Sequence, residues 1–450
     1  MSNKKTLISL FAGAGGLDLG LEQAGFITKI ANEIEPQACE TLRKNKVLCN
    51  LNSDEVDDFI AESLLQPCLK RLSDIDKKLF FKRIKTHTNK KKYLQECVVI
   101  EGDIRSIPSN RFQSLLDEEL FCIAGGPPCQ PFSKAGKQKS LDCTKNGDLF
   151  YEFIRLVKDL KPKWFLFENV KGITFTKTDV VYQLCEKCNT RDLASFEVRQ
   201  NFINDETSAA CERCGYKNTS WETVNESGGS LKIIFNEFEK LGYKCSHKVL
   251  NAADFGAPQI RERLIIIGSR DAVDFKWPKP THIKPSKKQQ KKEFFLEEEL
   301  KPWVTMRDAL WPGKHPIYGV YNEKKARLWV KNVVRPHDEP VTWSFDRPSP
   351  TIGAHQGAKL AFAPKGVPEK QLFRQQWATK GRKQGDTPPV PVEHQYLSDE
   401  ELLKLQTFPA FWYLHGTRMQ RAFQIGNAVP PILGKVIGEA ILAAEKNNDN

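Results

Sequence analysis

A cysteine held between prolines is the residue in this chain whose setting most clearly favours covalent chemistry. Residues 125–131 read GGPPCQP, and two glycines followed by prolines form a rigid, extended loop. A structural cysteine belongs in a core, so we interpret Cys129 as a nucleophile at the tip of this loop. Glu168, at the end of another apolar run, offers a carboxylic acid.

Two arginines alternate with other residues just before a further apolar run. In the pattern Gln259-x-Arg261-x-Arg263, an extended backbone points the three side chains to one side. A thiol, a carboxylic acid and guanidinium groups that converge at one place suit chemistry on an electrophilic ring.

A glycine-rich loop and two carboxylates predict a nucleoside site. The loop at residues 11–16 reads FAGAGG, follows the first apolar run and opens a helix whose N-terminus offers free N–H groups. Glu33 and Asp103 each follow a further apolar run, where a carboxylate accepts hydrogen bonds from ribose hydroxyls or an amino group. Asp18 replaces the glycine of a strict dinucleotide fingerprint, which disfavours a nicotinamide oxidoreductase.

Two CxxC pairs, separated by 22 residues, predict a structural zinc site. Protein would fill all four positions of the tetrahedral ion, so this zinc would hold a loop together and perform no chemistry. The expected ligands are Cys185, Cys188, Cys211 and Cys214.

Short apolar runs alternate with amphipathic helical patterns along the first 270 residues. The runs lie at 7–11, 98–100, 121–124, 164–167 and 264–267, and helical periodicity occupies 150–160 and 231–241. Such alternation predicts an α/β fold with a doubly wound, mostly parallel sheet. Ligands bind at the carboxyl ends of its strands, which is where the candidate residues fall.

The amino-acid composition indicates which kind of partner and which cellular compartment to expect. The 450 residues carry 68 Lys and Arg against 56 Asp and Glu, and the net charge of +12 favours a polyanionic partner. No apolar run of about 18 residues and no cleavage signature is found, so we expect a cytosolic protein with no membrane partner. In that compartment the 12 cysteines stay reduced.

These patterns resemble the signature motifs of the cytosine-C5 DNA methyltransferases, in that family's order from residue 7 to about 442. The motifs are FAGAGG at 11–16, NE at 32–33, GDI at 102–104, PPCQPFS at 127–133, ENV at 168–170, QxRxR at 259–263, LQTFP at 405–409 and QIGNAVP at 424–430.

The resemblance implies a Rossmann-like methyltransferase that uses S-adenosylmethionine and flips a cytosine out of double-stranded DNA. Cys129 would add to C6 of the ring, Glu168 would relieve charge at N3, and Arg263 would hold O2 with Arg261 braced nearby. The implied cofactor-binding residues are Phe11, Gly13, Gly15, Glu33, Ile34, Asp103, Ile104, Pro128, Leu149, Asn427 and Val429.

The expected organisation has a catalytic domain at 1–279, a smaller, irregular β-rich target-recognition domain at 280–395, and a segment at 396–450 that returns to the catalytic domain. Two insertions interrupt the first: a helical, basic stretch at 45–96 and the zinc knuckle at 180–220. We hypothesise that the knuckle extends the DNA-contacting surface.

Two alternatives stay open: a transfer-RNA cytosine-C5 methyltransferase, and a non-catalytic, zinc-containing DNA-binding subunit. Intact Cys129, Glu168 and Arg263 disfavour the second. By resemblance we expect a monomer that protects host DNA beside a restriction endonuclease. The recognised DNA sequence cannot be derived from these residues.

Overall fold

The structure is a computed structural model in which part of the chain is described. The described residues are 5–51, 55, 58, 92–128, 148–194, 210–217, 219–285, 300–310, 327–330, 341–344, 346–354, 361–363, 397–409 and 411–448. Cys129, most of the expected 45–96 insertion and much of 280–395 lie outside them.

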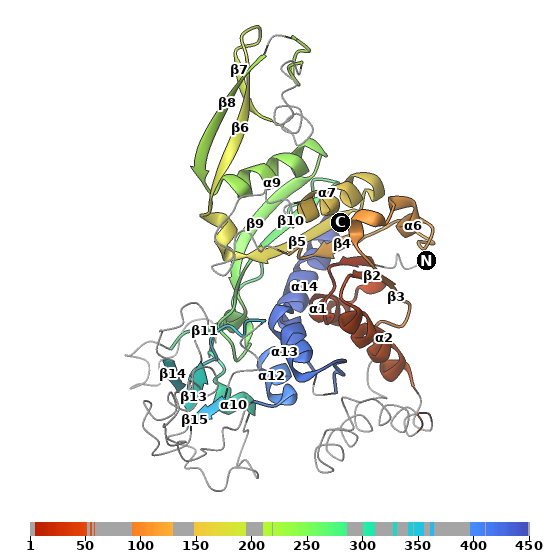
Figure 1. Cartoon of the computed structure of the whole chain (residues 1–450), viewed down its shortest axis with the longest axis vertical. Helices are drawn as coiled ribbons and strands as arrows, with labels where there is room; N and C mark the ends of the chain where they lie inside the picture. Colours follow the sequence, from red (N-terminus) through yellow and green to blue (C-terminus); the bar gives the residue numbers. More distant parts are fainter. Residues whose placement is uncertain are drawn as a thin grey trace, which may run out of the picture.

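A seven-stranded sheet forms the centre of the molecule, in the order β3-β2-β1-β4-β5-β10-β9 (Figure 1). The pairs within β3-β2-β1-β4-β5 are parallel, and β10 runs antiparallel to both of its neighbours. The predicted mostly parallel sheet is therefore confirmed. The strands are β1 (Thr6–Leu10), β2 (Ile27–Glu33), β3 (Val98–Glu101), β4 (Cys122–Gly125), β5 (Trp164–Val170), β9 (Lys244–Asn251) and β10 (Glu262–Ser269).

Both faces of the sheet are buried at the central strands β1, β4, β5 and β10, which explains why these strands read as continuous apolar runs. In β5, Phe165 and Phe167 join a core cluster on one face, while Trp164 and Leu166 join a cluster on the other. The first face is covered by α6 (Ser109–Gln113), α7 (Asp148–Leu160) and α9 (Gly229–Lys240). The second is covered by α1 (Gly16–Ala24) and α14 (Pro431–Asn448), so the sheet is doubly wound.

The C-terminal helices pack back onto the beginning of the chain (Figure 1). A Cβ at Gly20 of α1 would meet backbone atoms of Pro431 and Gly434, and a Cβ at Gly434 of α14 would meet the carbonyl of Leu17, so glycines on both helices allow their close approach. Helix α2 (Pro36–Asn50) and helices α12 (Asp399–Leu405) and α13 (Arg418–Asn427) share a further cluster. Arg418–Asn448 has the length and composition of a membrane span, but 61% of its apolar window is buried inside this structure.

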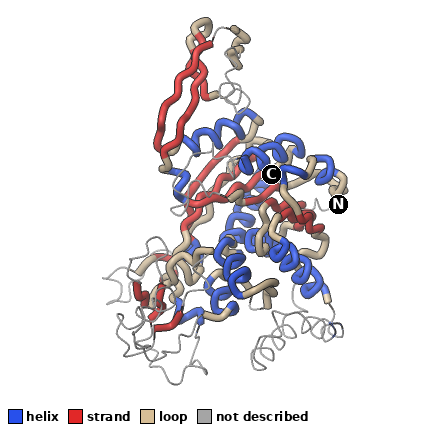
Figure 2. The backbone as a smooth tube through the Cα atoms, viewed as in Figure 1, coloured by secondary structure: helices blue, strands red, loops and turns tan. Residues whose placement is uncertain are grey.

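A three-stranded antiparallel sheet in the order β7-β6-β8 projects from the molecule beyond α9 (Figure 2). It follows β5 through the 3-10 helix η2 (Lys171–Thr174). Its strands are β6 (Lys177–Cys185), β7 (Thr190–Leu193) and β8 (Thr219–Ser227). We call this projecting sheet and its turns, residues 177–227, the arm.

Short strands lie at the other end of the molecule, in the sequence region expected to be irregular and β-rich (Figure 1). A small antiparallel sheet has the order β14-β13-β15, and β11 pairs with β12. The described elements there are β11 (His282–Ile283), β12 (Lys301–Pro302), α10 (Met306–Leu310), β13 (Arg327–Val330), β14 (Val341–Ser344) and β15 (Ala361–Ala363).

Candidate active site

The carboxyl ends of β1, β2, β3, β4 and β5 meet at one edge of the sheet because these strands are parallel. The glycine-rich loop, Glu33, Asp103, Gly126 and Glu168 all lie at or just beyond these ends. The candidate residues are therefore brought to one edge from positions far apart in the sequence.

The glycine-rich loop after β1 has an unusual backbone. Gly13 and Gly15 adopt positive φ angles of 56° and 78°, and Phe11 also has a φ of 56°, a conformation that costs energy for a residue with a side chain. Among the described residues, no atom lies within 4 Å of where a Cβ of Gly13 would be, so this part of the structure leaves space beside the loop. Trp412 stabilises the loop, because its Nε1 donates a hydrogen bond to the carbonyl of Ala14 at 3.0 Å.

Glu33, the last residue of β2, ties the glycine-rich loop to the neighbouring strand. One carboxylate oxygen accepts from the backbone N–H of Gly13 at 2.7 Å, and the other accepts from those of Ile34 and Glu35 at 2.8 and 2.9 Å. Burial raises the pKa of Glu33, while these N–H groups oppose the shift. Ile34 beside it is 54% exposed, which is unusual for an isoleucine and leaves an apolar surface at this edge.

Asp103 follows β3 and caps the 3-10 helix η1 (Ile104–Ser106). Its carboxylate is paired with the Arg105 side chain, whose Nε lies 3.0 Å from both oxygens. The hydrogen bonds from Arg105 lower the pKa of Asp103, so the group is a carboxylate at neutral pH. Ile104 is only 2% exposed, and its side chain packs in the core instead of lining the open edge.

The remaining expected cofactor residues are placed unevenly around this edge. Val429 is buried. Its carbonyl oxygen lies 2.2 Å from where a Cβ of Gly16 would be, so Val429 packs directly against the end of the glycine-rich loop. Leu149, near the start of α7, is largely buried, whereas Pro128 and Asn427 are exposed.

Glu168 and Arg263 form a buried ion pair at the ends of β5 and β10. Arg263 Nε lies 2.9 Å from Glu168 Oε1, and the two side chains are 13% and 12% exposed. The register explains the pair: Ile265 lies opposite Glu168, so Arg263, two residues earlier on β10, projects from the same face. Burial raises the pKa of Glu168, and the charges of Arg263 and Arg261 oppose that rise.

The loop that leads to Cys129 is packed against this ion pair. A Cβ at Gly126 would collide with the Glu168 carboxylate, so the glycine is required for this approach. Asn169 Nδ2 donates to the carbonyl of Pro127 at 3.3 Å. Gly126, three residues before Cys129, therefore lies against Glu168.

Gln259 and Arg261 bind different partners from Arg263, although the alternating pattern places all three side chains on one side. Both side chains are fully buried, and they bind backbone groups of segments that return from later in the sequence. Arg263 therefore contacts Glu168 directly in an ion pair. Arg261 makes no such contact, and its charge acts on Glu168 only through space.

Two polar residues near the site are ones that sequence reasoning missed. Asp18 of α1 is fully buried and accepts a hydrogen bond from Ser9 Oγ on β1, and burial raises its pKa to about 7. The Arg105 side chain donates hydrogen bonds to the carboxylate of Asp103. The spacing Asp103-x-Arg105 was a usable signal for the second; for Asp18 the sequence shows only a carboxylate inside an apolar helix pattern.

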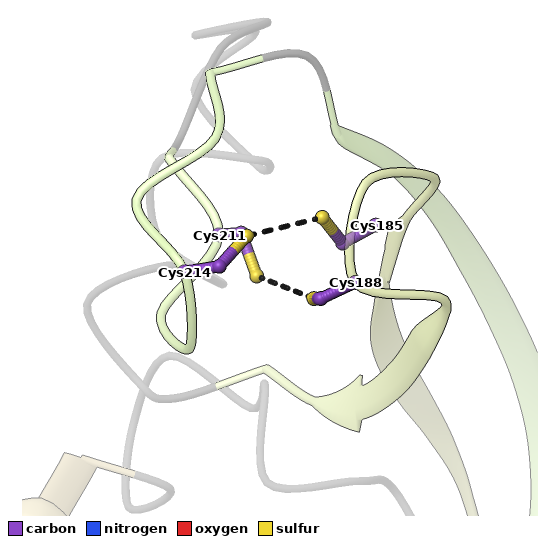
Figure 3. A group of neighbouring side chains, drawn as sticks. All are labelled: Cys185, Cys188, Cys211 and Cys214. Carbon is purple, nitrogen blue, oxygen red and sulfur yellow. Dashed lines mark hydrogen bonds between the residues drawn. The ribbon is translucent and has the colours of Figure 1, made fainter.

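Four cysteine thiols meet near the tip of the arm (Figure 3). Their Sγ atoms all lie within 4.8 Å of one another, a grouping that could hold a metal ion. Cys185 is the last residue of β6 and Cys188 lies in the turn that follows, whereas Cys211 and Cys214 belong to a tight turn in which the Gly215 N–H donates to the Cys211 carbonyl. Burial raises the pKa of Cys211, but hydrogen bonds from the backbone N–H groups of Cys214 and Arg213 and from the thiols of Cys188 and Cys185 together lower it to about 6. The predicted ligands Cys185, Cys188, Cys211 and Cys214 are thus brought together.

Comparison with known proteins identifies the class and then the family. The chain shares its Rossmann-like fold with the crystal structure of S. pombe Dnmt2 methyltransferase, with a TM-score of 0.51 at 14% identity and 100% of both chains covered. The family model of the C-5 cytosine-specific DNA methylases matches residues 5–68, 71–200 and 223–443. This chain belongs to that family.

Two relatives are similar over most of their length. Type II methyltransferase M.AquIA of Picosynechococcus sp. is 32% identical over 313 residues, covering 68% of this chain and 88% of the relative. Type II methyltransferase M1.HphI of Haemophilus parahaemolyticus is 27% identical over 460 residues, covering 98% of this chain and 88% of the relative.

Proposed function

We propose that this protein transfers the methyl group of S-adenosylmethionine to C5 of a cytosine within a specific double-stranded DNA sequence. The observation that carries the proposal is the buried pair of Glu168 and Arg263, packed against the loop that leads to Cys129. Because its relatives are Type II methyltransferases, we infer a modification enzyme of a restriction-modification system, acting as a monomer in a bacterial cytoplasm.

The edge formed by β1, β2 and β3 fits the adenosine part of the cofactor. Glu33 offers a buried carboxylate for ribose hydroxyls, and the carboxylate of Asp103, which is paired with Arg105 in the structure, is assigned to the adenine amino group. The exposed Ile34 and the open space beside Gly13 give an apolar wall and room for a ring. When bound, the cofactor supplies an electrophilic methyl group. The further residues of the proposed cofactor site are Phe11, Gly15, Pro128, Leu149, Asn427 and Val429.

The chain's own residues account for the activation of cytosine. C5 of cytosine is a poor nucleophile, and addition of the Cys129 thiolate to C6 makes C5 electron-rich. We assign Glu168 to share a proton with ring N3, a role that burial favours because it raises the pKa of this carboxyl, and we assign Arg263 to hold O2. After methyl transfer, loss of the C5 proton expels Cys129 and restores the aromatic ring. A cytosine in a duplex must first be flipped out to expose C6.

Asp103→Asn is expected to weaken binding of S-adenosylmethionine by about 10- to 100-fold, the range for loss of a hydrogen bond to a charged group. Asparagine keeps one acceptor oxygen but loses the negative charge and presents a competing N–H donor. Isothermal titration with the cofactor measures the change. Asp117→Asn, at an exposed carboxylate near the amino end of the sheet, is the matched control. Unchanged affinity in Asp103→Asn would contradict the assignment.

DNA recognition is proposed to reside at residues 280–395, between the catalytic residues 1–279 and the returning segment 396–450. The small sheet of β13, β14 and β15 lies in this region. In Figure 1 this small sheet lies at the opposite end of the molecule from the arm, and the central sheet lies between them.

We propose that the four cysteines of the arm bind one structural Zn²⁺. Four thiolates at mutual distances within 4.8 Å fit a tetrahedral zinc site with no open position. The arm carries six Lys and Arg against nine Asp and Glu, so its charge does not favour phosphate contact. Zinc is therefore assigned to the fold of the arm, and DNA affinity after zinc removal tests whether the arm contributes to binding.

Purified protein is expected to contain one zinc per chain, and the double substitution Cys211→Ser, Cys214→Ser is expected to lose it. Metal analysis by mass spectrometry gives the stoichiometry, and limited proteolysis reports whether the arm unfolds. Cys245→Ser, at a half-buried cysteine outside the cluster, is the control and should keep its zinc. A double variant that retains stoichiometric zinc would show that the metal is bound elsewhere.

A competition assay tests the proposed function. Purified protein, radiolabelled S-adenosylmethionine, unmethylated double-stranded DNA and transfer RNA are combined, and label is measured in each polymer. Label in DNA alone, located on C5 of cytosine, supports the proposal. Label confined to transfer RNA, or absent from both, would refute it.

A further inference from the structure

The pattern Gln259-x-Arg261 lies at a buried junction of four chain segments. Both side chains are fully buried. The segments that meet there are 258–261, 346–354, the end of α12 and the end of α13. Three of them come from later in the sequence, and their hydrogen bonds to Gln259 and Arg261 span 91, 146 and 165 residues.

Arg261 joins two of the returning segments through its guanidinium group. Its Nη1 donates to the carbonyl of Ile352 at 2.9 Å, and its Nη2 donates to the carbonyl of Gly426, near the end of α13, at 2.8 Å. Among the described residues its Nε has no hydrogen-bond partner. A planar, forked cation suits two carbonyls that diverge in this way, and lysine could satisfy only one of them well.

Gln259 joins the same segments through its side-chain amide. Its Oε1 accepts from the backbone N–H of Ile352 at 3.1 Å, and its Nε2 donates to the carbonyl of Leu405, at the end of α12, at 3.2 Å. Gln259 and Arg261 thus bind opposite backbone groups of the same residue, Ile352.

The backbone of residues 258–261 pairs with the segment at 346–354. Ser349 N donates to the carbonyl of Pro258 and Ile260 N donates to the carbonyl of Ser349, both at 2.8 Å. A Cβ at Gly426 would lie 2.6 Å from backbone atoms of Ala354, so α13 contacts the segment without intervening side chains. The segment is therefore held from both sides.

The 346–354 segment connects the small sheet to the catalytic edge. In the chain it lies between β14 and β15, which both pair with β13. It leaves that sheet, reaches residues 258–261 and then returns. Two residues beyond Arg261, Arg263 makes the ion pair with Glu168. The buried junction is thus covalently continuous with the small sheet on one side and with the ion pair on the other.

We propose that Gln259 and Arg261 are positioning residues that latch the 346–354 segment and the end of α13 in the register that Glu168 and Arg263 require for methyl transfer. Neither residue touches the cytosine or the cofactor; each acts through the backbone that it holds. The proposal rests on the proposed function, because methyl transfer is the step that the latch serves.

Hydrogen–deuterium exchange and single-turnover methylation of DNA test the latch in the full-length protein. The variants are Gln259→Leu, Arg261→Met and Arg261→Lys. Arg270→Met is the matched control, because Arg270 lies just after the other end of β10 and contacts Lys161 and Glu119 on the surface. The thermal midpoint and the cofactor affinity of each variant show that it is folded.

Arg261→Met is expected to accelerate exchange in peptides from 346–354 and to lower the single-turnover rate by about 10²-fold, as a small misplacement of reacting groups does. Its cofactor affinity should stay within about twofold of the wild type. Arg261→Lys should recover part of the rate, and Gln259→Leu should expose the Ile352 amide to exchange. Arg270→Met should resemble the wild type.

Exchange and turnover in Arg261→Met equal to those of Arg270→Met would overturn the latch. Loss of cofactor affinity in parallel with the rate would also overturn it, because the residue would then support the whole fold. A wild-type protein that methylates no DNA would refute the proposed function instead, while the exchange data would still decide whether Gln259 and Arg261 hold the segment.

Discussion

Cys129→Ala is expected to abolish methyl transfer, lowering the rate by about 10⁴-fold or more, as loss of a covalent nucleophile does in other enzymes. Without addition to C6, C5 of cytosine stays a poor nucleophile however well the cofactor is bound. Transfer of label from S-adenosylmethionine to DNA under single-turnover conditions measures the loss.

The same variant should bind the cofactor within about twofold of the wild type, because the adenosine edge at Glu33 and Asp103 does not depend on the thiol. Cys122→Ala, at a buried cysteine within β4 of the same sheet, separates loss of a nucleophile from loss of a packed sulfur. A residual rate in Cys129→Ala equal to that of Cys122→Ala would show that the reaction uses no thiol at residue 129.

Glu168→Gln is expected to reduce methyl transfer by about 10²- to 10³-fold, the usual effect of removing one group that stabilises transition-state charge. The structure gives the reason. Glutamine keeps the shape at the end of β5 but cannot carry a proton to N3, and the buried Arg263 loses the carboxylate that neutralises it. The ratio of single-turnover rates for the two proteins at the same pH measures the effect.

Glu262→Gln provides the matched control for Glu168→Gln. Glu262 is adjacent to Arg263 in the sequence but is exposed, and it pairs with Lys171 at the surface. An exposed pair contributes little, so this variant should retain the wild-type rate within about twofold. Equal losses in the two variants would indicate a general effect of charge and would contradict a specific role of Glu168.

Much of the central fold could be predicted from sequence because its strands are buried on both faces. The run at 164–167 reads as a strand by its apolar continuity, and in the structure alternate residues of β5 enter opposite cores. The functional edge was also predictable, because buried strands of this kind are parallel and parallel strands place their carboxyl ends together. Glu33 at the end of β2 is an example.

The junction around Arg261 could not be predicted, because it depends on contacts between residues far apart in the chain. An alternating Gln259-x-Arg261-x-Arg263 pattern shows only that three polar side chains share a side. Which of them meets Glu168 depends on the antiparallel register of β10 against β5. The partners of Arg261, carbonyls at Ile352 and Gly426, belong to segments whose return path carries no local signal.

The sequence likewise did not reveal the surroundings of two carboxyl groups, Asp103 and Asp18. Asp103 was expected to face a ligand, and the structure pairs it with Arg105, so a bound amino group would share or displace that partner. Asp18 was a departure from a glycine pattern in the sequence. In the structure it is a fully buried acid whose pKa is raised to about 7 beneath the glycine-rich loop.

The central claim is tested most directly by expressing the protein in a bacterial host that lacks cytosine-C5 methylation and sequencing the host DNA for cytosines that resist conversion. Cys129→Ala, produced at the same level, is the control. We predict that one short sequence context becomes fully methylated with the wild-type protein and stays unmodified with the control. Host DNA without modified cytosines, despite folded protein that binds S-adenosylmethionine, would contradict the account.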